Sequence, residues 1–235
     1  MTNIGLVYPV LQGKESVIRD IVRQLKERRS EYQQSRQRGG VTLERAYLQR
    51  NPDGTSLVVA YLEANRGFRE LMATLVDSDI ALDREFIAGN SEATGVDFSA
   101  GLQGPEPELV GEYVASGASG RGRGFAFAAP LQPGKTDDAR RFAREAYATR
   151  RTELAEARSA DGVTRECVFL NQTPAGDVIV VYLEAANPND ANRRFAESNA
   201  PFDRWFKDEC KKIFPPFIDF DQPVPENEEI FSSDV

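Results

Sequence analysis

The two halves of this sequence carry the same series of short motifs, about 121 residues apart. Chance alone does not keep five separate segments in the same order, so we interpret the chain as an internal duplication. The matching segments are 9–14 with 130–135, 41–44 with 163–166, 58–64 with 180–185, 83–86 with 203–206, and 96–98 with 218–220. Because each copy spans about 100 residues, each is long enough to fold as a small domain.

The repeats occupy residues 1–98 and 123–221, with a Gly, Pro and Ser-rich connector over 99–122 and an acidic tail over 222–235. The formal net charge of −8 lies mostly outside the repeats, since each repeat carries −1, the connector −2 and the tail −4. We therefore interpret the tail as a solvated extension, or alternatively as an arm that binds a partner.

Hydrophobic periodicity predicts the order strand, helix, strand, strand, helix, strand in each repeat. Tight-turn sequences at 51–54 and 173–176 each predict a central hairpin. The other predicted elements are strands 4–10 and 125–129, a helix over 15–36 and its counterpart around 139–147, helical regions 67–86 and 190–214, and a last strand before each repeat ends. This βαββαβ order is the ferredoxin-like plan, with both helices on one face of an antiparallel sheet.

The predicted strands are apolar at nearly every position, as in Leu57 to Leu62, so both faces of each sheet need to be covered. The second copy would supply that surface. At this point the sequence resembles the dimeric α/β-barrel superfamily, in which two ferredoxin-like units pack sheet against sheet. The resemblance implies an α+β fold of two tandem ferredoxin-like βαββαβ repeats, packed sheet to sheet as a pseudo-dimeric α/β barrel within one chain.

That superfamily includes monooxygenases resembling those of antibiotic biosynthesis, which use neither metal nor flavin, together with muconolactone isomerase-like and EthD-like proteins. The repeated Tyr-Leu-Glu-Ala and Asp-Arg-(Glu or Trp)-Phe patterns resemble most closely its uncharacterised members. Other members bind haem through histidine, and this sequence contains no histidine, so the resemblance does not extend to them.

The absence of histidine also excludes a Ser-His-Asp or Cys-His nucleophile and every metal site that depends on imidazole. The two cysteines, Cys167 and Cys210, lie in apolar segments and are interpreted as buried thiols. We therefore expect neither a metal nor another cofactor.

Candidate site residues come first from the duplicated strands. Residues two apart share one face of a strand, so Tyr61 lies beside Glu63 and Tyr182 beside Glu184. A phenol next to a carboxylate can orient a ligand or act as an acid–base pair without histidine. The alternative is that each glutamate only closes its strand or pairs with an arginine.

The second group of candidates lies in the last helix of each repeat. Adjacent Asp and Arg point about 100° apart on a helix, so each must find its own partner. The catalytic candidates are Glu184, Tyr182 and Asp203, and the ligand-binding candidates are Trp205, Phe202, Asn199, Ser198, Arg204, Tyr61, Glu63 and Asp83. Alternatively, Trp205 is core packing and the serines are helix caps. The richer aromatic set of the second repeat places the expected pocket there, beside Trp205.

These observations predict a metal-free protein that binds a small apolar or aromatic molecule, as a cofactor-independent oxygenase, isomerase or cyclase. The alternative is a non-catalytic module for ligand sensing or assembly, with its interior filled by side chains. The acidic charge argues against nucleic acid, and the sequence shows no membrane span or signal peptide, which indicates a cytoplasmic protein. A monomer and a homodimer are both compatible with the sequence.

Overall fold

The computed structural model describes residues 1–118 and 120–234. The chain forms two compact units. The first contains Met1–Pro107 and the segment from Glu228 onward, and the second contains Glu108–Asn227. Each unit has one antiparallel four-stranded sheet. The α+β class and the two tandem ferredoxin-like units predicted from the sequence are confirmed, and the packing of one sheet against the other stays a prediction.

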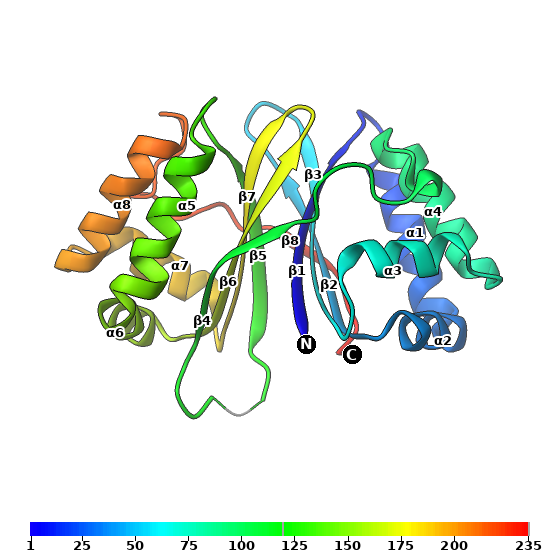
Figure 1. Cartoon of the computed structure of the whole chain (residues 1–235), viewed down its shortest axis with the longest axis horizontal. Helices are drawn as coiled ribbons and strands as arrows, with labels where there is room; N and C mark the ends of the chain where they lie inside the picture. Colours follow the sequence, from blue (N-terminus) through cyan, green and yellow to red (C-terminus); the bar gives the residue numbers. More distant parts are fainter. Residues whose placement is uncertain (119, 235) are drawn as a thin grey trace. The chain divides into compact units, whose positions relative to one another are not determined.

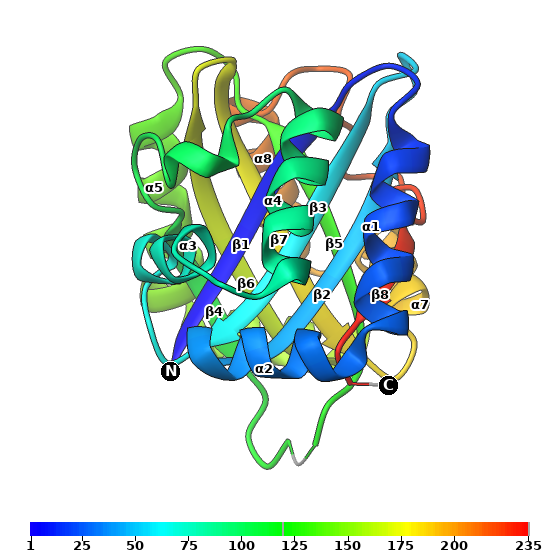
Figure 2. The same cartoon turned by 90° about the vertical axis from the view of Figure 1, so that its right-hand side faces the viewer.

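The first unit has the strand order β1-β3-β2-β8, which can be followed from left to right in Figure 2. Its strands are β1 (Thr2–Val10), β2 (Val41–Arg50), β3 (Ser56–Ala64) and β8 (Glu228–Ser232). Its helices are α1 (Glu15–Glu27), α2 (Arg29–Gly39), α3 (Phe68–Val76) and α4 (Ala81–Thr94), followed by a 3₁₀ turn, Phe98–Ala100. The helices cover one face of this sheet (Figure 1).

The second unit repeats this plan with the order β4-β6-β7-β5. Its strands are β4 (Glu108–Val114), β5 (Arg123–Pro130), β6 (Val163–Thr173) and β7 (Gly176–Ala185). Its helices are α5 (Thr136–Arg144), α6 (Arg151–Asp161), α7 (Pro188–Glu197) and α8 (Pro201–Ile213), and a π-helical turn, Glu145–Thr149, precedes α6. Again the helices lie on one face of their own sheet (Figure 1).

The fourth strand of each unit lies outside the repeats 1–98 and 123–221, within which the sequence predicted it. The segments 96–98 and 218–220 pair with no strand of the described chain; each instead inserts a phenylalanine into the core. The Phe98 ring lies 4.8 Å from that of Tyr8, and the Phe220 ring lies 5.1 Å from that of Phe214. Because each of these short segments buries its ring, it turns instead of continuing as a strand.

The missing strands come from the segments predicted as connector and tail. Strand β4, within the predicted connector, pairs with β6, and β8, within the predicted tail, pairs with β2. The tail is therefore not a solvated extension over 228–232, since Ile230 and Phe231 are buried against the first unit. Part of its acidic charge is also paired, because Arg19 donates to Glu228 at 2.7 Å.

Side chains point alternately to the two faces of each sheet, which places one set of them under the helices. In β3, Val58, Ala60 and Leu62 face the helices, while Tyr61 and Glu63 point to the opposite face. The main hydrophobic clusters of each unit therefore lie between its sheet and its helices. No helix in the described part of the chain has the length and apolar character needed to cross a membrane.

Candidate functional site

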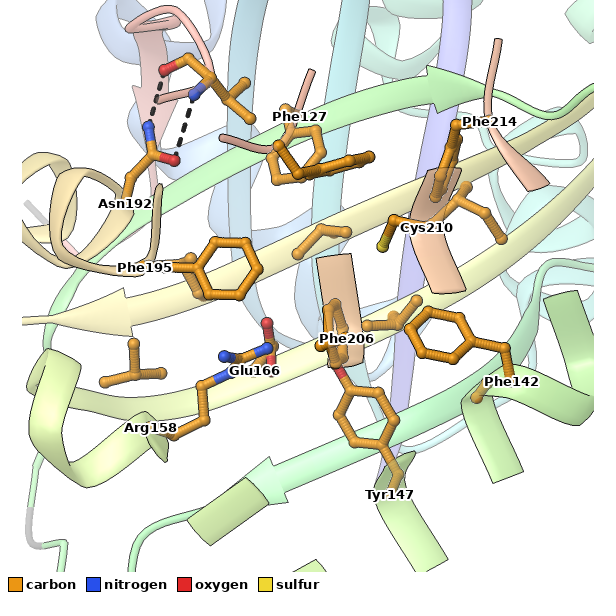
Figure 3. Close-up of a pocket in the computed structure, with 18 of the residues that line it drawn as sticks. Phe127, Phe142, Tyr147, Arg158, Glu166, Asn192, Phe195, Phe206, Cys210 and Phe214 are labelled. Atoms are coloured by element: carbon orange, nitrogen blue, oxygen red, sulfur yellow. Dashed lines mark hydrogen bonds and ion pairs between the residues drawn. The ribbon is translucent and has the colours of Figure 1, made fainter. Parts of the chain in front are cut away.

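A cavity of about 100 Å³ lies between the sheet and the helices of the second unit. Figure 3 shows phenylalanine rings around it, with Arg158 and Glu166 close together and Asn192 apart from them. Its aromatic lining is Phe127, Phe142, Tyr147, Phe195, Phe206, Phe214 and Phe220, and its polar lining is Arg158, Asp161, Glu166, Asn192 and Gln222. Cys210 also lines it and is buried, as predicted for both thiols.

A buried ion pair forms the polar side of this cavity. Arg158 near the end of α6 donates from Nε to Oε2 of Glu166 on β6 at 2.7 Å, and the two side chains are only 5% and 7% exposed. The guanidinium also lies over the rings of Phe195 and Phe206, about 5 Å from each ring centre. The pair therefore joins helix to sheet and is held from both sides by aromatic rings.

Asp161 adds a second carboxyl group to the polar side. It is the last residue of α6, and its Oδ2 lies 3.9 Å from Nη1 of Arg158 without a hydrogen bond from any described residue. Burial raises the pKa of Asp161 to about 6, and the charges of Asp203 and Glu166 act in the same direction. Asp161 is therefore a group whose charge changes near neutral pH.

Tyr147 enters the cavity from the π-helical turn. Figure 3 shows its ring pointing from the helix into the group of lining side chains. Its hydroxyl oxygen is buried and has no hydrogen-bond partner among the described residues. Burial raises the pKa of Tyr147 well above its usual value, and the negative charge of Glu166 raises it further. The phenol therefore keeps its proton.

The first unit contains a matching cavity, also of about 100 Å³. Arg36 and Glu44 repeat the ion pair there, with Nε to Oε2 again at 2.7 Å. Beside this pair, the hydroxyl of Tyr32 donates to Glu44 at 3.0 Å, but Tyr32 lies outside the cavity lining, and the tyrosine that lines this cavity is Tyr8. The two cavities thus share size and charge pair but differ in the tyrosine that lines them, which is Tyr147 in the second unit and Tyr8 in the first.

The tyrosine and glutamate predicted on each strand contact one another, but they lie away from the cavities. The hydroxyl of Tyr182 donates to Glu184 at 2.8 Å, and that of Tyr61 donates to Glu63 at 2.9 Å. All four side chains are buried on the sheet face opposite the helices. Glu184 also accepts from the backbone N–H of Gly122 at 3.1 Å. Each glutamate therefore lies next to the tyrosine two residues before it, as the strand spacing predicted.

The predicted helix residues separate into two groups. Ser198 donates to Asp203 at 2.5 Å and Ser78 donates to Asp83 at 2.5 Å, which repeats one contact in both units. In contrast, Asn199 and Arg204 are exposed.

Phe202 is buried, and Trp205 is half-buried. The Trp205 ring packs on Phe142 at 5.7 Å, and the guanidinium of Arg150 lies 3.9 Å from its centre. Among the described residues that line the two cavities, there is none of the catalytic or ligand-binding candidates named from the sequence.

The residues on the polar side of the cavity were not predicted from the sequence to lie together. The arginine recurs in both repeats eight residues before the glutamate, Arg36 with Glu44 and Arg158 with Glu166, and this spacing was a usable signal. Tyr147 has no such counterpart. Within the described residues, no cluster of His, Cys, Asp and Glu side chains is arranged to hold a metal ion.

Comparisons with known proteins concern mainly the fold. Residues 126–219 match the model of a family of unknown function (DUF6176). None of the curated proteins matches the chain. The chain is similar to the crystal structure of an anthrone oxidase-like protein, with a TM-score of 0.50 and 8% sequence identity over 97% of this chain and 90% of that one.

It is also similar to a protein titled "Putative monooxygenase" from Fusobacterium nucleatum subsp. nucleatum, with a TM-score of 0.49 and 10% identity over 98% of this chain and 92% of that one. At such low identity a likeness concerns the fold alone. The likeness to the anthrone oxidase-like structure, together with the two repeated units, shows that the chain has a ferredoxin-like fold.

Proposed function

We propose that the protein binds a small, largely apolar molecule in the cavity of the second unit. The observation that carries this proposal is an apolar cavity with a buried ion pair and an unpartnered hydroxyl at one side. Ligand sites in proteins typically combine apolar walls with a few convergent polar groups. The first-unit cavity has the walls and the ion pair, but among its described lining residues no buried hydroxyl lacks a partner.

The size of the cavity limits the ligand. An apolar cavity of about 150 Å³ is large enough to bind benzene, so a cavity of about 100 Å³ suits one ring with small shifts of the walls. A molecule of two or more fused rings would require displacement of Phe206 or Phe195. The predicted ligand class therefore narrows from any apolar metabolite to a compact, single-ring molecule.

A reaction on this ligand, of the cofactor-independent oxygenase, isomerase or cyclase type, would use groups that reach the cavity. Those groups are Tyr147 and Asp161, because Tyr182 and Glu184 point to the opposite face of the sheet. A carboxyl group with a pKa of about 6 is suited to exchange a proton near neutral pH. Turnover would appear as loss of the bound probe, with or without oxygen consumption.

The alternative function is a ligand-sensing or assembly module without catalysis. It is favoured by the dense aromatic packing around the cavity, since the Phe206 ring lies 4.8 Å from Phe142 and 5.7 Å from Phe195. Under this alternative a sensing module binds the same probes and leaves them unchanged, whereas an assembly module with a filled interior binds none of them.

The test is a titration of the intact chain with benzene, toluene and phenol, followed by NMR of the methyl groups that line the cavities. We expect saturable shifts confined to the second unit. Ala139→Leu, which fills that cavity, should abolish them, whereas Ala60→Leu, which fills the first-unit cavity, should leave them unchanged. The proposal fails when no probe binds, or when Ala60→Leu removes the binding and Ala139→Leu does not.

A further inference from the structure

The two repeats differ by one residue within their first helical region. The repeat offset is 121 residues at Lys14 and Lys135, and it becomes 122 at Arg28 and Arg150. The extra residue falls in the π-helical turn Glu145–Thr149. A π turn widens a helix to hold one added residue, and such turns are frequent at functional sites. Here the added residue accompanies a tyrosine that faces the cavity.

The edge strand of the second unit leaves room for this tyrosine. In the β4–β6 ladder Gly111 is opposite Val168, and in the β8–β2 ladder the equivalent position, opposite Ala46, is Phe231. A Cβ atom on Gly111 would lie 2.6 Å from the Tyr147 ring. The first unit therefore fills this space with an apolar ring, whereas the second unit fills it with a ring that carries a hydroxyl.

The hydroxyl of Tyr147 is suited to donate a hydrogen bond. It is buried and lacks a partner among the described residues, and a buried donor without an acceptor destabilises the empty cavity. The carboxylate of Glu166 accepts from Arg158 and lies near enough to this hydroxyl to raise its pKa, and Asp161 adds a second carboxyl group nearby. Because these carboxyl groups disfavour a ligand anion, the acceptor that fits is a neutral oxygen.

We propose that Tyr147 determines specificity in this cavity by donating a hydrogen bond to the carbonyl oxygen of a compact cyclic ketone. The inference rests on the proposed function, because it names the ligand class of the same site. The apolar walls hold the ring of the ketone, and the Tyr147 hydroxyl distinguishes the ketone from a hydrocarbon of the same shape. Tyr32 has no such role, since its hydroxyl is bonded to Glu44.

The experiment compares two probes of nearly identical shape, cyclopentanone and methylenecyclopentane, on the full chain. Affinities are measured by NMR titration for the wild type, Tyr147→Phe and the matched control Tyr32→Phe. We expect Tyr147→Phe to weaken cyclopentanone binding about 2- to 10-fold, the loss of one hydrogen bond, and to leave methylenecyclopentane binding unchanged. Tyr32→Phe should change neither affinity at the second unit.

An infrared difference spectrum provides a second measurement, which would show no effect if the role of Tyr147 were only structural. The carbonyl stretch of cyclopentanone bound to the wild type should shift to lower frequency, as in a hydrogen-bonded ketone, and Tyr147→Phe should remove the shift. An unshifted stretch in the wild type overturns the inference even if the variant does not fold. Equal ketone affinity in the wild type and Tyr147→Phe overturns it too, with the proposed function intact. Binding of neither probe overturns the proposed function itself.

Discussion

Arg158 and Glu166 are joined across 2.7 Å inside the second unit, and they connect helix α6 to strand β6. The first unit makes the same connection with Arg36 and Glu44. A buried ion pair gains little net stability, because removing two charges from water offsets much of their attraction. Its retention in both copies is therefore better explained by the geometry that it imposes, which keeps a charged group at one side of each cavity.

Breaking this pair should be costly. In Glu166→Gln the Arg158 guanidinium stays buried without its counter-charge, so we expect a loss of about 3 to 5 kcal/mol in the free energy of unfolding. Chemical denaturation measures it, and Glu44→Gln should give a loss of similar size in the first unit. The control is Arg141→Ala, which removes a surface pair with Asp138 and should cost less than about 1 kcal/mol. Equal losses in all three variants would contradict the prediction.

Much of the fold could be predicted because local patterns decide it. The hairpins follow from turn sequences that end in Gly54 and Gly176, both with positive φ. The fourth strands could not be found in this way. Segment 228–232 has only Ile230 and Phe231 as apolar residues in an acidic context, and its strand conformation depends on pairing with β2, far away in the sequence.

The candidate site was less predictable than the fold. On β7 the spacing showed that Tyr182 and Glu184 share a face, but both faces of this strand are apolar, so the pattern did not indicate which face meets the helices. Tyr147 depends on a π turn, and one inserted residue in a helix leaves no periodic signal. Its approach to Gly111 is a tertiary contact that joins segments distant in the sequence.

Asp161→Asn should change how stability depends on pH. The pKa of Asp161 is raised to about 6 in the folded protein by burial and by the charges of Asp203 and Glu166, against the attraction of Arg158 and Arg194. The folded state therefore holds a proton between about pH 4 and 6 that the unfolded state releases, so this carboxyl group lowers stability as pH rises through that window. The asparagine removes the effect.

We expect Asp161→Asn to be more stable than the wild type at pH 7.5, by roughly 1 to 3 kcal/mol, and closer to it at pH 4.5. Urea unfolding at both pH values measures the difference. The exposed Asp137→Asn is the control and should show no such pH-dependent difference. A variant that loses stability at pH 7.5 would show that the Arg158 contact outweighs the burial of the carboxyl group.

Phe231→Ala should destabilise the protein although the residue lies near the end of the chain. The ring is 4% exposed and packs edge-on against Tyr32 at 5.3 Å, so its removal leaves a cavity in the first unit. The expected cost is about 3 to 5 kcal/mol. Phe217→Ala is the matched control, because that ring is 79% exposed and its loss should cost little. Calorimetry compares the two, and similar melting temperatures would contradict the position of β8 in the sheet.

The variant Trp205→Ala tests whether the Trp205 ring only packs against its neighbours or also contacts the ligand. The Trp205 ring is half-buried between Phe142 and the Arg150 guanidinium, outside the lining of the cavity. We therefore expect a stability loss of about 2 to 3 kcal/mol, less than for a fully buried tryptophan, with probe affinity nearly unchanged. Phe206→Ala, one residue later, removes a lining ring and should enlarge the cavity, so that it admits naphthalene as well as benzene. Thermal unfolding and NMR titration of both variants measure these effects. Loss of benzene binding in folded Trp205→Ala would place the ligand beside Trp205 and away from Tyr147.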